Sequence, residues 1–439
     1  METERKTLTQ LSVPICLETL FYMLSGMVDT LMLSSVSDQA VGAVGTANTY
    51  IGVFIIMFGV ISSGMVAVMS QNIGAGRPGI AYQARQLGLV FNALTGILMS
   101  VVLAVFSGGI LRAVSIAPAL LESAETYLKI VGGASFLNAL IPIFSSYLRV
   151  FGYTKHSLIG TVVGNVINII LNSVFLFVFH WGVMGVATAT VISKVVNLII
   201  VAAMGAVLIK AKQSPERAQP RRILAQIVKI GFPSVFETAL YNVAMTFIVC
   251  FMNHMDTDGM NVTARSYAMQ IANFSYCVGA ALAQANAIMT GWRIGAKKYE
   301  ECDRGTRKAV IYGLVTATCF SVTFAITGRF IVHIFTNDIQ MIELVVKLLV
   351  VDIFLEFGRV TNLVYGQALK TSGDAIFPVI MGAIFMYLFA VGGTYFLGIH
   401  MGLLAVGAYI AMAGDECARA VGMVLRWKSG KWKSKSLVE

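Results

Sequence analysis

The stretch VPICLETLFY, residues 13–22, decides the fold, because a counterpart, FPSVFETALY, occurs at residues 232–241. Glu18 matches Glu237 and Tyr22 matches Tyr241, at an offset of 219 residues in a chain of 439. A pattern that recurs at half the chain length indicates an internal duplication. Each copy places a carboxylate in an apolar run, where it costs about 3 kcal/mol in hydrocarbon. Because a costly acid occurs in both copies, we expect Glu18 and Glu237 to have a functional or structural role.

Three further pairs of segments recur in the same order at nearly the same offset. They are NIGAGR (72–77) with RIGAKK (293–298), LRVFG (148–152) with LKTSG (369–373), and WGVMG (181–185) with HMGLL (400–404). A constant offset along both halves makes chance matching a poor explanation. The chain is therefore predicted to consist of two related halves.

The composition indicates an integral membrane protein. Hydrophobic residues make up 57% of the chain and charged residues only 12%, about half the share in soluble domains. The mean hydropathy is +0.78. Continuous apolar runs of about 20 residues predict helices rather than the alternating strands of a membrane barrel. About twelve such runs are found, near 11–34, 45–71, 87–110, 125–150, 157–179, 184–208, 228–252, 264–290, 306–327, 340–366, 374–397 and 402–425.

The runs predict an all-α polytopic membrane protein with about twelve transmembrane helices in two pseudo-symmetric six-helix lobes. Because six is even, both halves insert in the same orientation, and a cavity is expected between them. The expected boundaries are an N-lobe at 1–209, a cytoplasmic linker at 210–227, a C-lobe at 228–425 and a basic cytoplasmic tail at 426–439.

Most Lys and Arg residues fall on one side if the N-terminus is cytoplasmic, as the positive-inside rule requires. We therefore expect a multi-pass protein of the cell (inner, cytoplasmic) membrane with both termini in the cytoplasm. The net charge of +10 is interpreted as this topology signal together with attraction to anionic lipid. No aromatic and basic module supports binding to nucleic acid.

Several segments together resemble the multidrug and toxic compound extrusion (MATE) family. They are VDTLML with Asp29, QNIGAGR (71–77), LRVFGYT (148–154), NVINIILN (165–172), WGVMGVATAT (181–190), LEFGRVTNLV (355–364) and LKTSGDAIFP (369–378). The resemblance implies an antiporter that exports organic, often cationic, compounds in exchange for H⁺ or Na⁺ by alternating access. It also implies that small organic molecules and membrane lipids are the partners, that no cofactor is needed beyond the coupling ion, and that the protein acts as a monomer.

The resemblance further implies a cation site in the N-lobe. Asp29 falls on the family's first-span Asp and Asn168 on its fifth-span Asn. Asn172 stands where many members have Asp. An Asn can ligate Na⁺ but cannot exchange a proton, so proton coupling in this lobe would depend on Asp29 and Glu18. Asp29, Asn168 and Asn172 would hold a metal ion only if Na⁺ is the coupling ion.

Glu18 and Asp29 are eleven residues apart, so they share one helix face about 16 Å apart along the axis. Coupling by protonation or by Na⁺ is one interpretation. For Glu18 the alternative is a hydrogen-bonded structural acid, and for Asp29 it is an interfacial residue that caps a loop. Asp29 has Ile248 at its repeat position, so the N-lobe is the first choice for the coupling site.

Each half also has a Tyr one turn beyond its Glu, since residues i and i+4 are neighbours on a helix. Glu18 with Tyr22 and Glu237 with Tyr241 would suit an organic cation, through charge pairing and cation–π contact. Glu237, Tyr22 and Tyr241 are therefore candidates for substrate binding. The alternative is that the two acids stabilise the structure.

Three charged residues, Asp352, Glu356 and Arg359, form one stripe and are further substrate-binding candidates, with a closed salt bridge as the competing interpretation. Asp415, Glu416 and Arg419 form a similar cluster, for which we favour a charge network. Lys194 lies at the corresponding place in the first half. Asn165, Asn168 and Asn172 also share a face and either serve the cation site or bond between helices.

No enzyme is expected, because the chain lacks a Walker motif and a Ser-His-Asp or His-metal arrangement. A rival within the same mechanical class is a lipid-linked precursor flippase of a related fold. That function predicts a strongly cationic cavity, whereas the acids within the spans favour an exporter.

Overall fold

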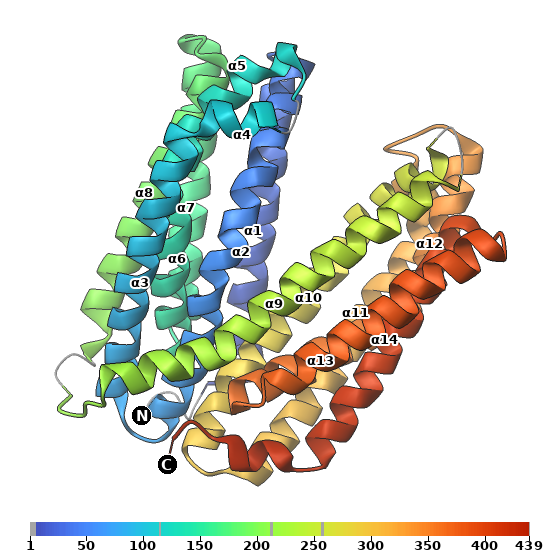
Figure 1. Cartoon of the computed structure of the whole chain (residues 1–439). Helices are drawn as coiled ribbons and strands as arrows, with labels where there is room; N and C mark the ends of the chain where they lie inside the picture. Colours follow the sequence, from blue (N-terminus) through green and yellow to red (C-terminus); the bar gives the residue numbers. More distant parts are fainter. Residues whose placement is uncertain (1–5, 114–115, 211–213, 256–258, 439) are drawn as a thin grey trace. The chain divides into compact units, whose positions relative to one another are not determined.

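The computed structural model describes residues 6–113, 116–210, 214–255 and 259–438, and every regular element in these ranges is helical (Figure 1). The first half holds α1 (Leu8–Ser34), α2 (Asp38–Gly74), α3 (Pro78–Val105), α4 (Ser107–Ala113), α5 (Pro118–Tyr127), η2 (Leu128–Gly132), α6 (Phe136–Val150), α7 (Thr154–Ser173), η3 (Val174–Val178) and α8 (Gly182–Leu208). The second half holds α9 (Pro220–Asn253), α10 (Met260–Gly295), α11 (Tyr299–Val332), α12 (Ile339–Ser372), α13 (Ile376–Phe385), η5 (Met386–Val391), η6 (Thr394–His400), α14 (Leu404–Lys428) and η7 (Lys431–Lys435).

These elements join into the twelve predicted spans, six in each half. Two features break the regularity: α5, η2 and α6 form one span with a bend of 42°, and π-helical turns continue α7 and α13. Every apolar run in the sequence coincides with one such span. The all-helical, twelve-span fold is therefore confirmed.

Eight helices in the described ranges are long and apolar enough to cross a membrane, or nine if the bent pair counts as one. The three remaining spans are α10, α12 and α14. Charged side chains in α12 and α14, among them Asp352, Glu356, Asp415 and Glu416, lower the hydropathy of those helices. Two of these three spans thus carry several buried acids, which are rare and usually face the interior in membrane proteins.

The start of α9 differs from the predicted boundary. The helix begins at Pro220, so residues 220–227, which we expected in the linker, are helical. Pro is well tolerated in the first turn of a helix, where its missing N–H has no partner to lose. Residues 211–213 of the expected linker and residue 439 of the expected tail lie outside the described residues.

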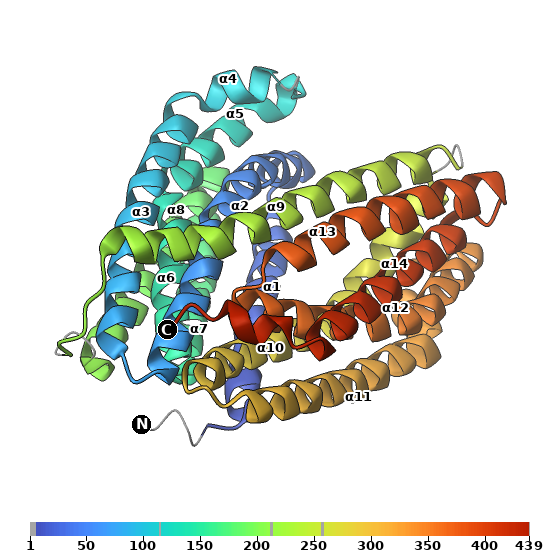
Figure 2. The same cartoon turned by 60° about the horizontal axis from the view of Figure 1, so that its bottom comes forward.

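The chain divides into two compact units, mainly Val13–Phe232 (unit 1) and Pro233–Glu439 (unit 2). The core of unit 1 gathers Ala43, Leu111, Leu128 and their neighbours, from α2, α4 and η2. In unit 2, α10, α11, α12 and α14 pack side by side (Figure 2). A core of unit 2 includes Ile248 and Leu348.

Helices α2 and α9 cross closely within unit 1. A Cβ atom added to Gly64 would clash with the backbone oxygen of Ile227, and one added to Gly231 would clash with that of Val60. Only glycine allows this approach, which is typical of closely packed membrane helices. The first turns of α9 therefore pack closely against α2.

The basic tail folds against unit 2. The indole of Trp432 stacks on that of Trp427 with ring centroids 4.2 Å apart. The Asp374 carboxylate accepts hydrogen bonds from Arg426 Nε and Lys435 Nζ, both at 2.7 Å. Burial raises the pKa of Asp374, but the hydrogen bonds from Arg426 and Lys435 outweigh it and hold this pKa below its usual value.

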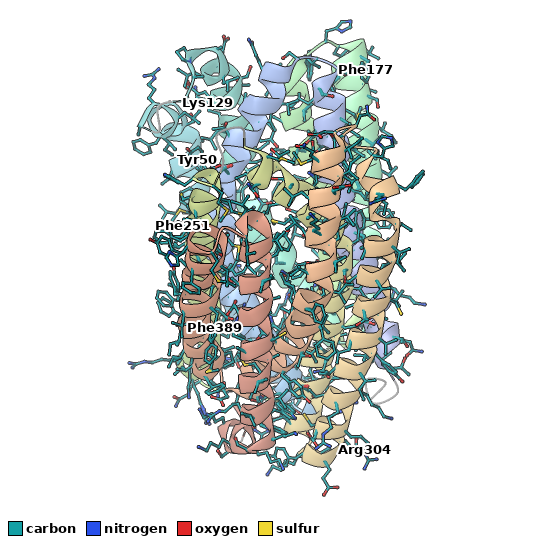
Figure 3. All side chains as sticks on the ribbon, turned by 90° about the vertical axis from the view of Figure 1, so that its right-hand side faces the viewer. Tyr50, Lys129, Phe177, Phe251, Arg304 and Phe389 are labelled. Carbon is teal, nitrogen blue, oxygen red and sulfur yellow. The ribbon has the colours of Figure 1, made fainter. Side chains whose placement is uncertain are left out.

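The outer surface of the helices is apolar, as lipid contact requires. Phe177 and Phe389 project outward and are exposed, whereas Arg304 lies near an end of α11 (Figure 3). Lipid offers no hydrogen bonds, so apolar side chains suit this surface and polar groups have to find partners inside the protein. The polar groups that remain inside the units form the clusters described next.

Candidate functional site

Glu18 lies in a closed polar cluster inside unit 1. Its Oε1 atom is 2.8 Å from Arg149 Nη2 and accepts hydrogen bonds from Ser157 Oγ at 3.0 Å and Thr161 Oγ1 at 3.4 Å. The side chain is 9% exposed. The carboxylate is thus paired with a base and accepts hydrogen bonds from two hydroxyls.

Asp29 forms a second cluster in unit 1, where α1 meets α7. Asn172 Nδ2 donates to Asp29 Oδ1 at 2.6 Å and lies 3.3 Å from Asn168 Oδ1. One turn earlier, Asn165 Nδ2 donates to the backbone oxygen of Phe21 at 2.7 Å. The three Asn side chains therefore share the face that contacts α1, as their spacing indicates.

The donor set at Asp29 suits a hard cation. Asn168 and Asn172 are buried, and Asn172 Oδ1 has no hydrogen-bond partner. The Asp29 carboxylate and the two amide oxygens are oxygen ligands, the type that hard cations prefer. Turning the Asn172 amide would aim its oxygen at the same point as Asp29, since the two orientations of an amide are nearly isosteric.

Lys194 of α8 is a half-buried base near this cluster in unit 1. Its Nζ donates to Asn138 Oδ1 at 2.9 Å, and the ammonium lies within electrostatic range of Asp29. An ionised Asp29 therefore has a nearby positive charge that does not bind it directly. Asp29 and Lys194 together are therefore neutral when both are ionised, and they carry a net positive charge when Asp29 binds H⁺ or Na⁺.

Glu237 of unit 2 repeats the ion pair of Glu18 with a different setting. Its Oε2 atom is 2.6 Å from Lys370 Nζ, and its side chain is 22% exposed. Lys370 occupies the repeat position of Arg149, in the paired segments LRVFG and LKTSG. The duplication thus preserved the ion pair, although the base changed.

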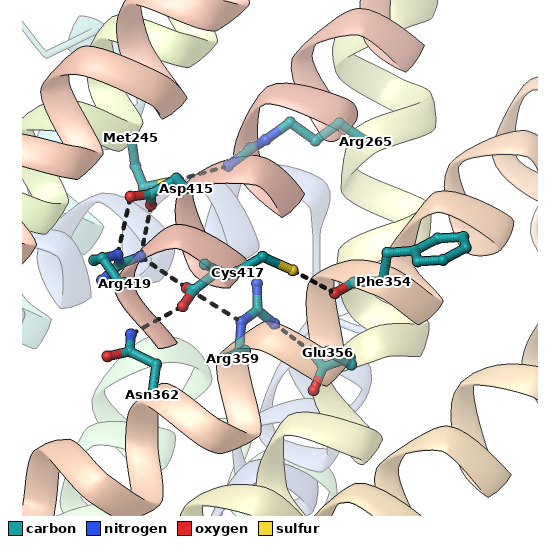
Figure 4. A network of polar contacts seen from close by, with 10 residues as sticks. Met245, Arg265, Phe354, Glu356, Arg359, Asn362, Asp415, Cys417 and Arg419 are labelled. Carbon is teal, nitrogen blue, oxygen red and sulfur yellow. Dashed lines mark hydrogen bonds and ion pairs between the residues drawn. The ribbon is translucent and has the colours of Figure 1, made fainter. Parts of the chain in front are cut away.

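Charged residues of α12 and α14 form one connected network in unit 2 (Figure 4). Arg359 pairs with Glu356 and lies 3.7 Å from Glu416 Oε1. Arg419 joins Glu416 at 2.9 Å to Asp415 at 2.6 Å. Three acids thus share two guanidinium groups, so the network holds one excess negative charge when every member is ionised.

Asp352 stands apart from this network. It is 4% exposed, one turn from Glu356 on α12, and makes no hydrogen bond or ion pair with the residues that the structure describes. The stripe Asp352, Glu356 and Arg359 therefore separates into a closed pair and an acid without a direct partner.

A cavity of about 490 Å³ lies within unit 2 and brings several candidates together. Its lining includes Glu237, Tyr241, Asp352, Arg359, Lys370 and Glu416. The volume falls in the range of sites for drug-sized ligands, about 300–1,000 Å³. Of the residues expected to bind substrate, Glu356 faces the ion-pair network and is not among the lining residues.

Tyr22 is an expected substrate residue that does not line the cavity of unit 2. Its side chain is 67% exposed on α1 of unit 1. It belongs to a different unit from Tyr241, so the cavity of unit 2 does not include it. The acid-and-tyrosine element is therefore present twice in the sequence but has different surroundings in the two units.

Sequence reasoning missed three bases: Arg149, Lys370 and Arg265. The signal for Arg149 and Lys370 was available, because they occupy one repeat position just as Glu18 and Glu237 do. Arg265 lines the cavity from α10 and has no such signal, since a single Arg near the start of a span is ordinarily interfacial.

Comparison with known proteins shows full-length similarity to membrane transporters. A family model described as MatE matches residues 14–174 and 233–396, once in each half. "Uncharacterized transporter YisQ" of Bacillus subtilis (strain 168) is 32% identical, over 98% of this chain and 96% of the relative. "Probable multidrug resistance protein NorM" of Thermotoga maritima is 26% identical, over 99% and 94%. A solved multidrug resistance MATE family transporter in an outward-facing conformation has a TM-score of 0.87 at 18% identity, covering 97% and 96%.

Proposed function

The chain belongs to the MatE family of membrane transporters, and we propose that it is a secondary antiporter that exports organic, cationic or amphiphilic compounds in exchange for H⁺ or Na⁺. The observation that carries this proposal is the division of polar groups between the units. Unit 1 has a small-cation donor set at Asp29, and unit 2 has a cavity large enough for an organic molecule.

The cavity of unit 2 supports an organic substrate. Glu237 and Asp352 supply negative charge, Tyr241 and Tyr276 supply aromatic faces, and Met269 is adaptable apolar surface. Acids beside aromatic rings bind organic cations by charge pairing and cation–π contact. The named multidrug resistance relatives are consistent with this substrate class.

The Asp29 cluster supports coupling in unit 1. Asp29 is the acid of unit 1 whose direct partner is an amide rather than a base, so binding of H⁺ or Na⁺ does not have to break an ion pair. A coupling ion drives transport only if it binds one conformation better than another. We propose that occupation of Asp29 changes the packing of α1 against α7 and thereby favours one state.

The cavity charges favour this function over lipid-linked precursor flipping. Four bases line the cavity, namely Arg265, Arg359, Lys370 and Arg419, together with three acids, Glu237, Asp352 and Glu416. A mixed lining of this kind differs from the strongly cationic cavity that a flippase of polyanionic precursors requires. An exporter of organic compounds therefore fits better.

We further propose that the protein acts as a monomer in the cell membrane with both termini in the cytoplasm. The positions of Lys and Arg along the sequence support this orientation. The two units would then be the two lobes of the transporter, and no cofactor beyond the coupling ion is needed.

The test is efflux of ethidium from proteoliposomes under an imposed pH or Na⁺ gradient. The wild type is expected to move ethidium when one of the gradients is applied. Asp29→Asn and Glu237→Gln are expected to lower the rate about tenfold or more, whereas the exposed-acid control Glu122→Gln keeps it. If neither gradient drives efflux of ethidium or another amphiphile, the antiporter proposal is wrong.

A further inference from the structure

Arg265 is a buried base that lacks a carboxylate partner. It lies near the start of α10, lines the cavity of unit 2 and is 8% exposed. Its only side-chain polar contact in the described part of the chain joins Nη2 to the sulfur of Met245 at 3.7 Å (Figure 4). Its Nε atom has no hydrogen-bond partner. A thioether is a weak acceptor, so the guanidinium keeps nearly all its donor capacity.

The other arginines that line the same cavity are paired with acids. Arg359 pairs with Glu356, and Arg419 pairs with Asp415 and Glu416. A buried charge without a counter-ion costs several kcal/mol, so chains that keep one usually use it. Among the described residues of unit 2, Arg265 is therefore the cavity base without a carboxylate partner.

We infer that Arg265 binds an oxyanion group, a carboxylate or a phosphate, carried by the transported compound. A guanidinium presents donors in a planar fork that matches both groups, which makes it a better oxyanion ligand than an ammonium. This inference rests on the proposed function only in treating the ligand of the cavity as cargo.

Asp352 extends the inference to the charge pattern of the ligand. It lines the same cavity, is buried and has no direct ion pair. The lining thus offers one unpaired base and one unpaired acid, and no ion pair joins them. An amphoteric compound, with a carboxylate for Arg265 and an ammonium or iminium for Asp352, neutralises both charges at once.

The experiment uses two probes that differ only in the oxyanion. Tetramethylrhodamine carries a free carboxylate, and its methyl ester has the same cationic ring system without that charge. Binding of each dye to the full-length protein in neutral detergent is followed by fluorescence anisotropy. The wild type is expected to bind the acid about tenfold or more tightly than the ester, the usual contribution of a charged hydrogen bond.

Variants assign the preference to Arg265. Arg265→Gln is expected to abolish the preference for the acid while leaving ester binding within about twofold, and Arg265→Lys is expected to keep part of it. The matched control is Arg329→Gln, which removes an exposed base of α11 that does not line the cavity. Asp352→Asn is expected to weaken binding of both dyes, since both carry the cation.

A competition arm separates a soluble oxyanion compound from a lipid headgroup. Phenyl phosphate is expected to displace the acid dye from the wild type but not to affect the ester. If anionic phosphatidylglycerol displaces the acid dye and phenyl phosphate does not, Arg265 serves a lipid headgroup and the inference is overturned.

Two other results overturn the inference. If the wild type binds the acid dye and the ester dye equally well, the cavity has no oxyanion subsite. If Arg265→Gln keeps the full preference for the acid dye, Arg265 does not bind the oxyanion. Because binding is measured without a gradient, these results leave antiport untouched, whereas failed ethidium efflux counts against the proposed function alone.

Discussion

Both units have a Glu at the same repeat position, but the residues around it differ between the units. In unit 1 a base and two hydroxyls surround Glu18, from Arg149, Ser157 and Thr161. In unit 2 the pair of Glu237 and Lys370 is kept, but Pro378 and Gly382 occupy the repeat positions of Ser157 and Thr161. Glu237 consequently lines a cavity, whereas Glu18 is enclosed.

This difference shows that the duplication preserved the ion pair, whereas the residues around the pair determine whether it is enclosed. An enclosed pair stabilises the packing of three helices, α1, α6 and α7. In the proposed function, the open pair supplies charge to the cavity where the substrate binds. The residues beside the acid, rather than the acid alone, therefore decide whether it is enclosed or lines a cavity.

Removing the base should have the largest effect, and a larger one in unit 1. Arg149→Met leaves Glu18 buried without its counter-ion and is expected to lower the free energy of unfolding by about 3–5 kcal/mol. Lys370→Met should cost about 1–2 kcal/mol less, because Glu237 is more exposed. Thermal unfolding in detergent measures both.

The double variant Glu18→Gln with Arg149→Met is the control for this comparison. It should recover much of the lost stability, since no unpaired charge remains. Equal losses for Arg149→Met and Lys370→Met would contradict the distinction between a closed and an open pair.

Asp374 should show a pH-dependent effect that unit 1 lacks, because Tyr153 stands at its repeat position. The pKa of Asp374 is lowered by Arg426 and Lys435. Its stabilising contribution is therefore present above the unfolded pKa of about 4 and is lost as the pH falls through the lower, folded value. Asp374→Asn should cost about 2 kcal/mol at pH 7.

The difference between wild type and Asp374→Asn should shrink as the pH falls below about 4. Unfolding midpoints measured from neutral to acidic pH provide the check. A difference that stays constant with pH would show that the carboxylate charge contributes nothing.

Gly382→Ser should make the Glu237–Lys370 pair resemble the enclosed Glu18–Arg149 pair. Of the changes considered, it should have the smallest effect on stability. A Cβ atom at Gly382 would lie 3.4 Å from Glu237 Oε1, an ordinary contact, so a serine hydroxyl can reach the carboxylate. Dye binding should weaken about fivefold and stability should rise by about 1 kcal/mol. Gly382→Ala should share the gain in stability but not the loss of binding.

The repeat predicted most of the fold, because a polar pattern that recurs in two apolar halves restricts the helices strongly. The alignment of VPICLETLFY with FPSVFETALY located α1 and α9, and the Asn spacing located the face of α7 that contacts α1. The early start of α9 was missed, because a basic segment with a Pro reads as a linker until its first turn is seen to be helical.

The site was less predictable, because partners across helices leave no local signal. Nothing in the spacing of α12 shows that Arg359 joins α14 through Glu416 while Asp352 stays apart. The same holds for Arg265, because the sequence does not show that this buried base lacks a carboxylate partner. Roles of Asp29, Asn168, Asn172 and Glu237 in transport remain predictions.

The division of labour between the units is tested most directly by measuring binding and coupling in the same variants. Ethidium affinity in detergent and gradient-driven ethidium efflux in proteoliposomes are compared for Asp29→Asn and Glu237→Gln. Asp29→Asn is predicted to keep its affinity within about twofold and to lose efflux, while Glu237→Gln loses affinity about tenfold. If Asp29→Asn loses affinity and Glu237→Gln keeps it, the assignment of coupling to unit 1 and substrate to unit 2 is contradicted.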